Sequence, residues 1–307
     1  MISIIIPTYN RSEFLLNSIN SILSQSIKDF EILVVDDGST DNTKEVVTNL
    51  SDKRILYFNY GKIGNISKLR NIGIKKSNYD IIGFCDDDDL WSDPDKLKKQ
   101  LKHLKNYNLV CSNALVIDSE GNTIKEKYYH EFDKDFIVDK SHLLSRGNSV
   151  LTPGILLNKN LLIKHNLFFD ETEFSIYCED YEFLIRLSSY TEMYFVAQTL
   201  ISVRIHDSVS GGFDNKMKML NSSIKILKNH SALTKYNVDK VNVKKGIIGF
   251  HICIIKLSYV YNNYICFKEV LRFLIFLGNP KNIMIFFNLK IIPFFKNILS
   301  SKSIAKN

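Results

Sequence analysis

The stretch Ser3-Ile4-Ile5-Ile6-Pro7-Thr8-Tyr9-Asn10 decides the fold class, because a short β-branched run stops there at a proline and a polar turn. A second such run spans Glu31 to Val35. Between the two runs, Glu13 to Ser24 carries apolar residues at a helical spacing. A strand, a helix and a second strand in this order predict a β-α-β unit at the start of the chain.

The same alternation continues beyond the first unit. The pattern predicts helices over residues 43–50, 68–76, 94–105 and 181–187, and strands over 54–58, 81–84 and 109–116. Residues 128–148 show no pattern that assigns them. Strands that alternate with helices predict a mostly parallel sheet with helices on both faces, and such sheets bind ligands beyond the carboxyl ends of their strands.

Polar loops follow three of the predicted strands: Thr8-Tyr9-Asn10, Asp36-Asp37-Gly38-Ser39 and Asp86-Asp87-Asp88-Asp89. All three should face one crevice. Four adjacent carboxylates repel one another and raise one another's pKa unless a cation or strong donors hold them. An oxygen-only site of this kind suits Mg²⁺ or Mn²⁺, which often bridges carboxylates to substrate phosphates. The alternative is a solvated acidic turn.

Composition indicates a folded protein of one large domain or of a domain with an appendage. The chain has 307 residues, of which 45% are hydrophobic. Its five cysteines are widely spaced and form no Cys-x-x-Cys pair, which indicates a reducing compartment and cytoplasmic localisation. The apolar run at the N-terminus ends at Pro7, too early for a signal peptide, so we expect a strand there.

Charge divides the chain into two parts. Residues 1–215 hold 24 Lys and Arg against 31 Asp and Glu, whereas residues 216–307 hold 16 against only Asp239 and Glu269. The second part is also rich in apolar stretches, such as 246–255, 257–267 and 273–278, all shorter than the roughly 18 residues of a spanning helix. Two interpretations stay open: helices that lie on an anionic membrane surface, and helices that pack on the first domain with a basic outer face.

Four motifs occur in order: Ile5 to Arg11, Val34 to Asp41, Arg70-Asn71-x-Gly73, and Asp86 to Trp91. Together they resemble the family 2 glycosyltransferases of the GT-A fold, of the bacterial surface-polysaccharide type. The resemblance covers about residues 1–215. It implies a Rossmann-like GT-A domain over 1–215, which binds a nucleotide sugar and carries catalysis, and leaves 216–307 as a helical, basic appendage.

The resemblance also implies an activity. The protein would move a sugar from a nucleotide diphosphate donor, most readily a UDP-sugar, to a hydroxyl of a glycan or lipid-linked acceptor. The products of related enzymes are surface polysaccharides such as O-antigen or capsule. Because the family reaction is a single displacement, it inverts the anomeric centre.

Binding residues are implied position by position. Thr8 and Asp37 would contact the nucleoside, with Tyr9 and Arg70 nearby. The family's Asp-x-Asp metal motif falls on Asp86-Asp87-Asp88, where Asp88 would bind Mn²⁺ or Mg²⁺ and Asp86 or Asp87 would face the ribose and diphosphate. The register within Asp86 to Asp89 is left open, since all four residues are identical. His206 resembles the histidine that completes the metal shell, although a lone histidine is more often structural.

Catalytic residues are implied in the same way. Gly154 resembles the glycine of the loop that lies against the donor and acceptor sugars. Glu179-Asp180 resembles the family's Glu-Asp pair, with Asp180 as general base and Glu179 as a contact for the sugar or acceptor. From the residues alone, two acids at the start of a helix also have a structural explanation in the helix dipole.

Two other classes of protein are alternatives to an enzyme. The basic segment 216–307 would allow nucleic-acid binding, but no nucleic-acid motif is present. A non-catalytic nucleotide-sugar-binding partner of a glycan-assembly complex is the stronger alternative. Such a partner would keep Thr8 and Asp37 but lose the metal ligand or the base, whereas this chain has both Asp88 and Asp180.

Overall fold

The computed structural model describes residues 1–173, 176–205, 212–233 and 237–261, together with 269, 272–273 and 275–278. The chain divides into two compact units by its internal contacts. The first unit comprises residues 1–143 and 148–212, and the second comprises 144–147 and everything from Phe213 onward. The functional division at residue 215 stays a prediction.

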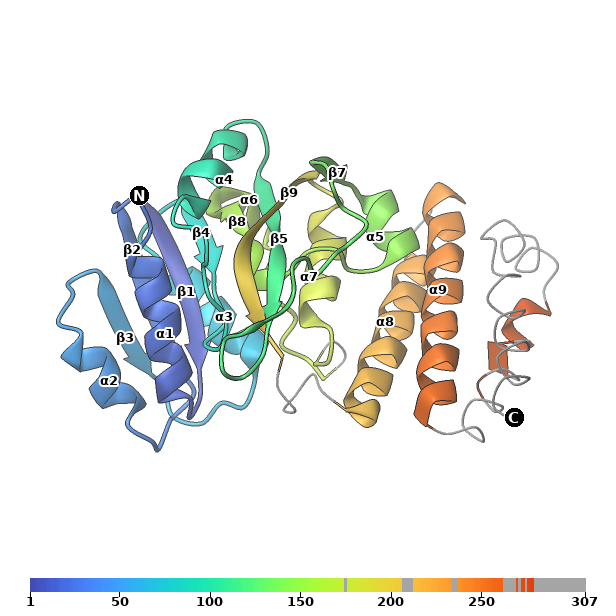
Figure 1. Ribbon diagram of the computed structural model, residues 1–307. Coiled ribbons are helices and arrows are strands. Elements are labelled where there is room, and N and C mark those ends of the chain that lie inside the picture. Colours follow the sequence, from blue (N-terminus) through green and yellow to red (C-terminus); the bar gives the residue numbers. More distant parts are fainter. Residues whose placement is uncertain are drawn as a thin grey trace. The chain divides into compact units, whose positions relative to one another are not determined.

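The first unit is built on a mixed sheet, which has nine strands within the described residues (Figure 1). Its strands are β1 Ile2–Thr8, β2 Phe30–Asp36, β3 Ile55–Asn59, β4 Ile81–Phe84, β5 Leu109–Ile117, β6 Thr123–Lys125, β7 Phe136–Val138, β8 Leu156–Asn158 and β9 Met193–Arg204. The order is β3-β2-β1-β4-β8-β5-β9-β7, with β6 beside β5. Strands β3, β2, β1 and β4 run parallel, and β8 pairs antiparallel with both β4 and β5.

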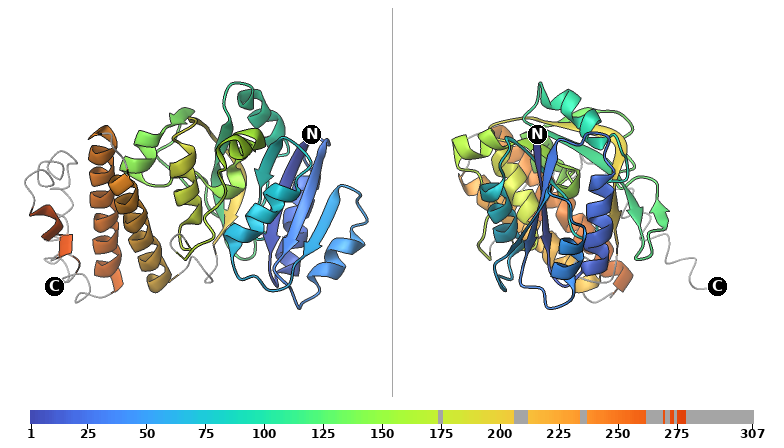
Figure 2. Two further views of the ribbon diagram at one scale, coloured as in Figure 1. Left: turned by 180° about the vertical axis from the view of Figure 1, so that it is seen from behind. Right: turned by 90° about the vertical axis from the view of Figure 1, so that its left-hand side faces the viewer.

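Helices lie on both faces of this sheet, as predicted. They are α1 Ser12–Leu23, α2 Thr43–Asn49, α3 Ile66–Lys76, α4 Lys96–Leu104, α6 Lys159–His165 and α7 Glu179–Leu187, while α5 Lys140–Arg146 spans the boundary between the two units. Helix α1 covers one face and α3 the other (Figure 2). Side chains of β1 explain this, because they alternate between the faces: Ile4 joins the core cluster that contains Leu15 of α1, whereas Ile5 contacts the position of Gly73 in α3.

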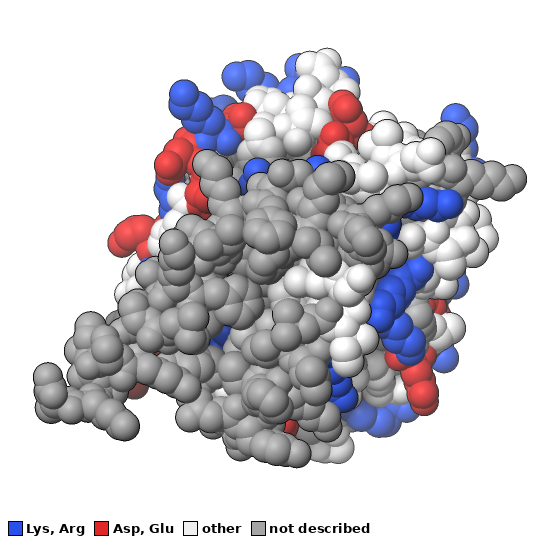
Figure 3. Space-filling model, turned by 90° about the vertical axis from the view of Figure 1, so that its right-hand side faces the viewer, with Lys and Arg blue, Asp and Glu red and all other residues white. Residues whose placement is uncertain are grey.

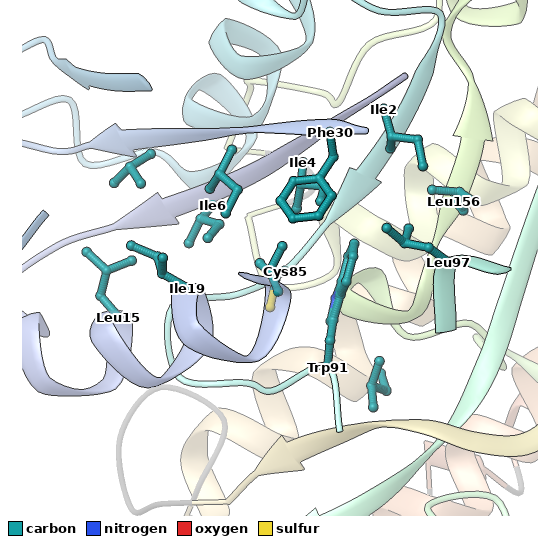
Figure 4. Packing of buried hydrophobic residues seen from close by; sticks show 14 of the residues in the cluster. Ile2, Ile4, Ile6, Leu15, Ile19, Phe30, Cys85, Trp91, Leu97 and Leu156 are labelled. Carbon is teal, nitrogen blue, oxygen red and sulfur yellow. The ribbon is translucent and has the colours of Figure 1, made fainter. Parts of the chain in front are cut away.

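Trp91 fixes the end of the Asp loop, residues Asp86–Asp89, which follows β4. Its side chain is 1% exposed and lies among apolar residues that include Cys85 and Leu97 (Figure 4). The indole Nε1 donates to the carbonyl of Pro153 at 3.2 Å. Because Phe84 belongs to the sheet and Trp91 to the core, Asp86–Asp89 are held as a short loop at the carboxyl end of β4.

The second unit contains two long helices, α8 Phe213–Leu233 and α9 Asn237–Tyr261, which confirms the predicted helical C-terminal region. A Cβ at Gly246 of α9 would lie 2.8 Å from Leu227 Cδ1 of α8, so the glycine permits a close approach. In the part of the chain that the structure describes, we found no helix with the length and apolar character needed to cross a bilayer. On the face drawn in Figure 3, Lys and Arg side chains and Asp and Glu side chains both appear among the described residues. Most of the predicted stretch 257–267 lies outside the described residues.

Candidate functional site

The three polar loops meet at the carboxyl ends of β1, β2 and β4. Strand β1 pairs in parallel with both neighbours, so the three strand ends lie side by side. Two hydrogen bonds join the loops directly: Thr8 Oγ1 donates to Asp87 Oδ2 at 2.9 Å, and the Asp37 amide donates to the Thr8 carbonyl at 2.9 Å. The structure therefore brings together the groups that the sequence placed in one crevice.

Asp37 is a charged acceptor that several donors surround. The amides of Ile63 and Gly64 donate to its Oδ1 at 2.5 and 2.9 Å, and Lys62 Nζ donates to Oδ2 at 2.9 Å. Burial alone would raise the pKa of Asp37, but these bonds outweigh it and lower the pKa. Lys62 Nζ also lies 3.0 Å from the centroid of the Tyr9 ring, a cation–π contact.

Gly38 allows the loop that carries Lys62 to come this close. Its φ is +76°, and an added Cβ would lie 2.7 Å from the backbone of Gly61 and Lys62. A side chain at this position would therefore push the two loops apart. Tyr9 and the Lys62 ammonium together form a cationic, aromatic wall next to Asp37, which suits a nucleoside.

The four aspartates of the Asp loop have different partners. Arg70 pairs with Asp86 at 2.8 Å, and Arg11 Nη1 pairs with Asp87 at 3.0 Å and with Asp88 at 2.6 Å. Asp89 accepts from the Arg204 amide at 2.9 Å. The repulsion expected from the sequence is thus relieved mainly by two guanidinium groups.

Burial raises the pKa values of two of these carboxyls, Asp87 and Asp89. It raises the pKa of Asp87 to about 6 in spite of Arg11, with Asp88 adding to the rise. The pKa of Asp89 is held well above its usual range by burial and by the neighbouring charges of Asp86 and Asp88. Asp86 and Asp88 are the more exposed members, at 28% and 15% of their side chains.

The donor set of this loop fits one kind of metal site. Within the described ranges, no group of three His, Cys, Asp or Glu residues is arranged to enclose a metal ion. Mg²⁺ and Mn²⁺ are also bound by one or two carboxylates together with substrate phosphates, and the partly exposed Asp88 fits that arrangement.

Arg70 connects the Asp loop to the start of α7. Its side chain is 5% exposed, and its Nη2 and Nη1 contact Asp86 at 2.8 Å and Glu179 at 2.7 Å. The two carboxylates are 93 residues apart in the chain, so one buried cation fixes the distance between the two acidic segments. Because a guanidinium is planar and its donors have fixed directions, a buried Arg that donates to two carboxylates holds them in a defined geometry.

Asp180 is a hydrogen-bonded carboxyl whose pKa is raised. Its Oδ1 accepts from the Tyr181 amide at 2.7 Å, and its Oδ2 accepts from Asn148 Nδ2 at 2.7 Å. Burial and the adjacent Glu179 raise the pKa of Asp180 to about 7, against the Tyr181 bond and the charge of Arg70. A carboxyl with a pKa near neutrality is suited to accepting a proton at physiological pH.

Two of the predicted site residues need separate comment. Gly154 is buried, and an added Cβ would lie 3.2 Å from the Ser112 carbonyl, which gives the glycine a packing reason. Its carbonyl accepts from Gln100 Nε2 at 2.7 Å. Its contact with sugars stays a prediction. His206 lies outside the described residues, and its role as a metal ligand stays a prediction.

Sequence reasoning assigned no role to three residues of this site: Arg11, Lys62 and Asn148. Arg11 stands directly after Thr8-Tyr9-Asn10, so its position next to the loops was available as a signal. Lys62 and Asn148 lie in segments whose conformation the sequence pattern did not define. Their contacts depend on long-range packing.

The model of the family described as Glycosyl transferase family 2 matches residues 3–165. An uncharacterized glycosyltransferase of Rickettsia typhi is 30% identical over 221 residues, which are 68% of this chain and 65% of that protein. A Campylobacter jejuni protein named GalNAc(5)-diNAcBac-PP-undecaprenol beta-1,3-glucosyltransferase is 38% identical over 148 residues, 47% of each chain. The alignments thus span less than two thirds of the length of these relatives.

Solved structures share the fold. The TarS protein of S. aureus, residues 1–349 in complex with UDP-GlcNAc, superposes with a TM-score of 0.59 and 18% identity over 84% of this chain and 83% of that chain. The mannosyltransferase PcManGT of Pyrobaculum calidifontis, in complex with GDP-Man and Mn²⁺, gives a TM-score of 0.57 and 12% identity over 95% and 84%. The predicted Rossmann-like GT-A fold class is confirmed.

Proposed function

Because the chain belongs to glycosyl transferase family 2, we propose that it transfers a sugar from a nucleotide diphosphate donor to an acceptor hydroxyl, with inversion at the anomeric carbon. The observation that carries the proposal is the Arg70 bridge between Asp86 and Glu179. It holds the Asp loop, which we propose binds the phosphates and the metal, next to a carboxyl whose pKa suits a base. Both halves of the proposed displacement would therefore lie in one site.

The donor nucleoside would lie against Thr8, Tyr9 and Asp37. Asp37 offers a charged acceptor for ribose or base donors, and the Tyr9 ring offers a face for stacking. UDP-GlcNAc in the related fold of TarS supports a UDP-sugar as donor. Arg11, which contacts Asp87 and Asp88, would also contact the diphosphate.

A divalent cation would be held by Asp88, with His206 as the proposed additional ligand and with oxygens of the diphosphate. When bound, Mn²⁺ or Mg²⁺ neutralises the negative charge that develops on the leaving diphosphate. Mn²⁺ in the PcManGT complex supports this choice of metal. Asp86 and Asp87, which Arg70 and Arg11 hold in place, would orient the ribose and diphosphate.

Asp180 would remove the proton from the acceptor hydroxyl as its oxygen attacks the anomeric carbon. A positioned base commonly contributes about 10²- to 10⁴-fold to the rate. Glu179, neutralised by Arg70 at 2.7 Å, would contact the sugar or acceptor without taking the proton. The acceptor attacks on the side opposite the leaving group, so an α-linked donor gives a β-linked product.

The acceptor would be a glycan or a lipid-linked glycan of surface polysaccharide synthesis, at the cytoplasmic face of a membrane. The C. jejuni relative is named for an undecaprenol-linked acceptor. Residues 216–307 carry 16 Lys and Arg and two acids, which suits an anionic lipid surface.

Vesicles with 30% anionic phospholipid should sediment the protein at low salt. Equal binding to neutral vesicles would refute this membrane contact.

A panel of nucleotide sugars, with and without Mn²⁺, tests the activity. The native protein should turn over one donor in a metal-dependent way, and Asp88→Ala should abolish that turnover. Asp118→Asn, in a turn at the end of β5, is a matched control and should keep activity. Donor binding without turnover, even with membrane extract as acceptor source, would overturn the proposal in favour of a non-catalytic partner.

A further inference from the structure

The amide of Asn148 has a fixed orientation. Its Oδ1 accepts from the Val150 amide at 2.9 Å, and its Nδ2 donates to Asp180 Oδ2 at 2.7 Å. A backbone N–H can only donate, so the oxygen of Asn148 must face Val150 and the nitrogen must face Asp180. The Val150 bond therefore commits Asn148 to act as a donor toward the carboxyl.

Both oxygens of Asp180 are held by donors. Asn148 binds Oδ2, and the Tyr181 amide binds Oδ1 at 2.7 Å. Two donors on opposite oxygens fix the plane of the carboxyl group and leave its remaining lone pairs for a proton from elsewhere. Donors of this kind favour the charged form of the carboxyl.

Other groups around Asp180 act in both directions. Glu179 and Asp86 repel its charge and raise the pKa, as burial does, and Arg70 lowers the pKa. Tyr128 and Tyr129 also lie within electrostatic range of Asp180 and bring phenol groups, whose own pKa values are raised. In this largely unfavourable setting, Asn148 supplies a neutral donor that stabilises the carboxylate and adds no net charge.

Asn148 is itself anchored. Its carbonyl accepts from Tyr129 Oη at 3.3 Å, and the next residue, Ser149, is 2.8 Å from His142 Nε2. Six residues after Asn148, Gly154 packs against Ser112, and its carbonyl accepts a hydrogen bond from Gln100. One segment of chain thus carries both the predicted sugar loop and the donor to Asp180.

We propose that Asn148 is a positioning residue for the general base: it orients the Asp180 carboxylate toward the acceptor hydroxyl and stabilises its charged form through a hydrogen bond. This inference rests on the proposed function, in which Asp180 takes the acceptor proton. It assigns a role to a residue outside the four motifs. It also predicts that the base depends on the segment 148–154.

The test compares pH–rate profiles of Asn148→Ala and Asn148→Asp with that of the native protein. Asn148→Ala removes the donor, so kcat should fall about 10- to 100-fold with little change in donor KM, and the acid limb of the kcat profile should move up by about one pH unit. Asn148→Asp keeps the shape of the side chain but places a second carboxylate against Asp180, so the acid limb of its kcat profile should move to a still higher pH. Asn122→Ala is the matched control, because Asn122 Nδ2 donates to Asp118 Oδ2 at 3.1 Å in an exposed turn.

The outcomes separate this inference from the proposed function. Circular dichroism and calorimetric donor binding establish first that each variant is folded with an intact donor site. If native protein turns over a donor but both Asn148 variants keep the native acid limb, the positioning role is wrong while the proposed function stands. If Asp180→Asn keeps native turnover, the proposed function itself is wrong. If the acid limb lies at the lowest pH in the native protein, at a higher pH in Asn148→Ala and at the highest pH in Asn148→Asp, the result supports both the positioning role and the proposed function.

Discussion

Asp180→Asn should abolish transfer and, at the same time, remove a pH-dependent loss of stability. The pKa of Asp180 is raised to about 7 in the folded protein, from an ordinary value of 3.8. Between these two values the folded protein binds a proton that the unfolded chain has released. Stability therefore falls as pH rises through this window, and the loss is complete above about pH 7.

The size of the effect follows from the raised pKa. One pKa unit corresponds to about 1.4 kcal/mol, so the rise from pH 5 to pH 8 would cost the native protein at most about 3 kcal/mol through this group. Asp180 is half-buried as a residue, so solvent screens part of its charge. We therefore expect about half of that value, roughly 1.5 kcal/mol.

A difference measurement isolates this contribution. The asparagine cannot accept from both Asn148 and the Tyr181 amide, so it loses a hydrogen bond. That loss is the same at both pH values and cancels when the change from pH 5 to pH 8 is compared between native and variant proteins. Titration of most other groups cancels for the same reason.

The assay is urea unfolding at pH 5 and pH 8, followed by the fluorescence of Trp91, the single tryptophan, which is buried in the first unit. Glu182→Gln is the matched control, on the same helix, because Glu182 pairs with Arg186 through a bond of 2.6 Å. If Asp180→Asn loses as much stability as the native protein between the two pH values, the assignment of a raised pKa to Asp180 is refuted.

Three further substitutions test other parts of the site and fold. Arg70→Lys should lower kcat/KM at least about 100-fold in donor turnover assays, because one ammonium cannot bridge Asp86 and Glu179 as the guanidinium does; near-native turnover would show that the bridge is dispensable. Burial lowers the pKa of Lys96 to about 7, so between about pH 7 and pH 10 the unfolded chain binds a proton that the folded protein has released, and the native protein gains stability as pH rises. Lys96→Met should remove this gain. Urea unfolding at pH 7 and pH 10 measures it in the native protein and in the variant. Gly73→Ala should destabilise the first unit by about 2 kcal/mol, because the new Cβ would meet Ile5 Cγ2 at 2.4 Å, and an unchanged urea midpoint would contradict this packing.

The sequence predicted the parallel part of the sheet because local signals and tertiary packing agree there. Strand β4 occupies residues 81–84, as predicted, and β1 and β2 extend the predicted runs by one residue at each end. Buried parallel strands are continuous apolar runs with polar residues immediately after them. The same boundaries placed Thr8, Asp37 and the Asp loop together.

Prediction failed where pairing joins distant segments. Strand β7 and helix α5 lie within residues 128–148, where no periodic pattern was found. Strand β8 has only three residues and is inserted antiparallel between β4 and β5. Such a short element is defined by its neighbours, so its own sequence carries little signal. Asn148 belongs to this part of the chain, which explains why its contact with Asp180 was not foreseen.

The balance of charge in the site explains why a cation and a donor should bind together. Among the described residues, seven carboxyl groups gather here, namely Asp37, Asp86, Asp87, Asp88, Asp89, Glu179 and Asp180. Two guanidinium groups and Lys62 pair with five of them. Asp89 and Asp180 avoid part of their repulsion through raised pKa values.

A nucleotide diphosphate would bring further negative charge into this acidic site, and Arg11 cannot fully neutralise both the Asp loop and the diphosphate. A divalent cation held by Asp88 would resolve the conflict, because it would compensate the carboxylates and leave the Arg11 guanidinium available for a phosphate oxygen. Arg11 would link the two events, because its guanidinium contacts Asp87 and Asp88 at 3.0 and 2.6 Å and would then be shared between these carboxylates and a phosphate oxygen. The proposed metal requirement therefore follows from the charge of the whole site as much as from the Asp-x-Asp pattern.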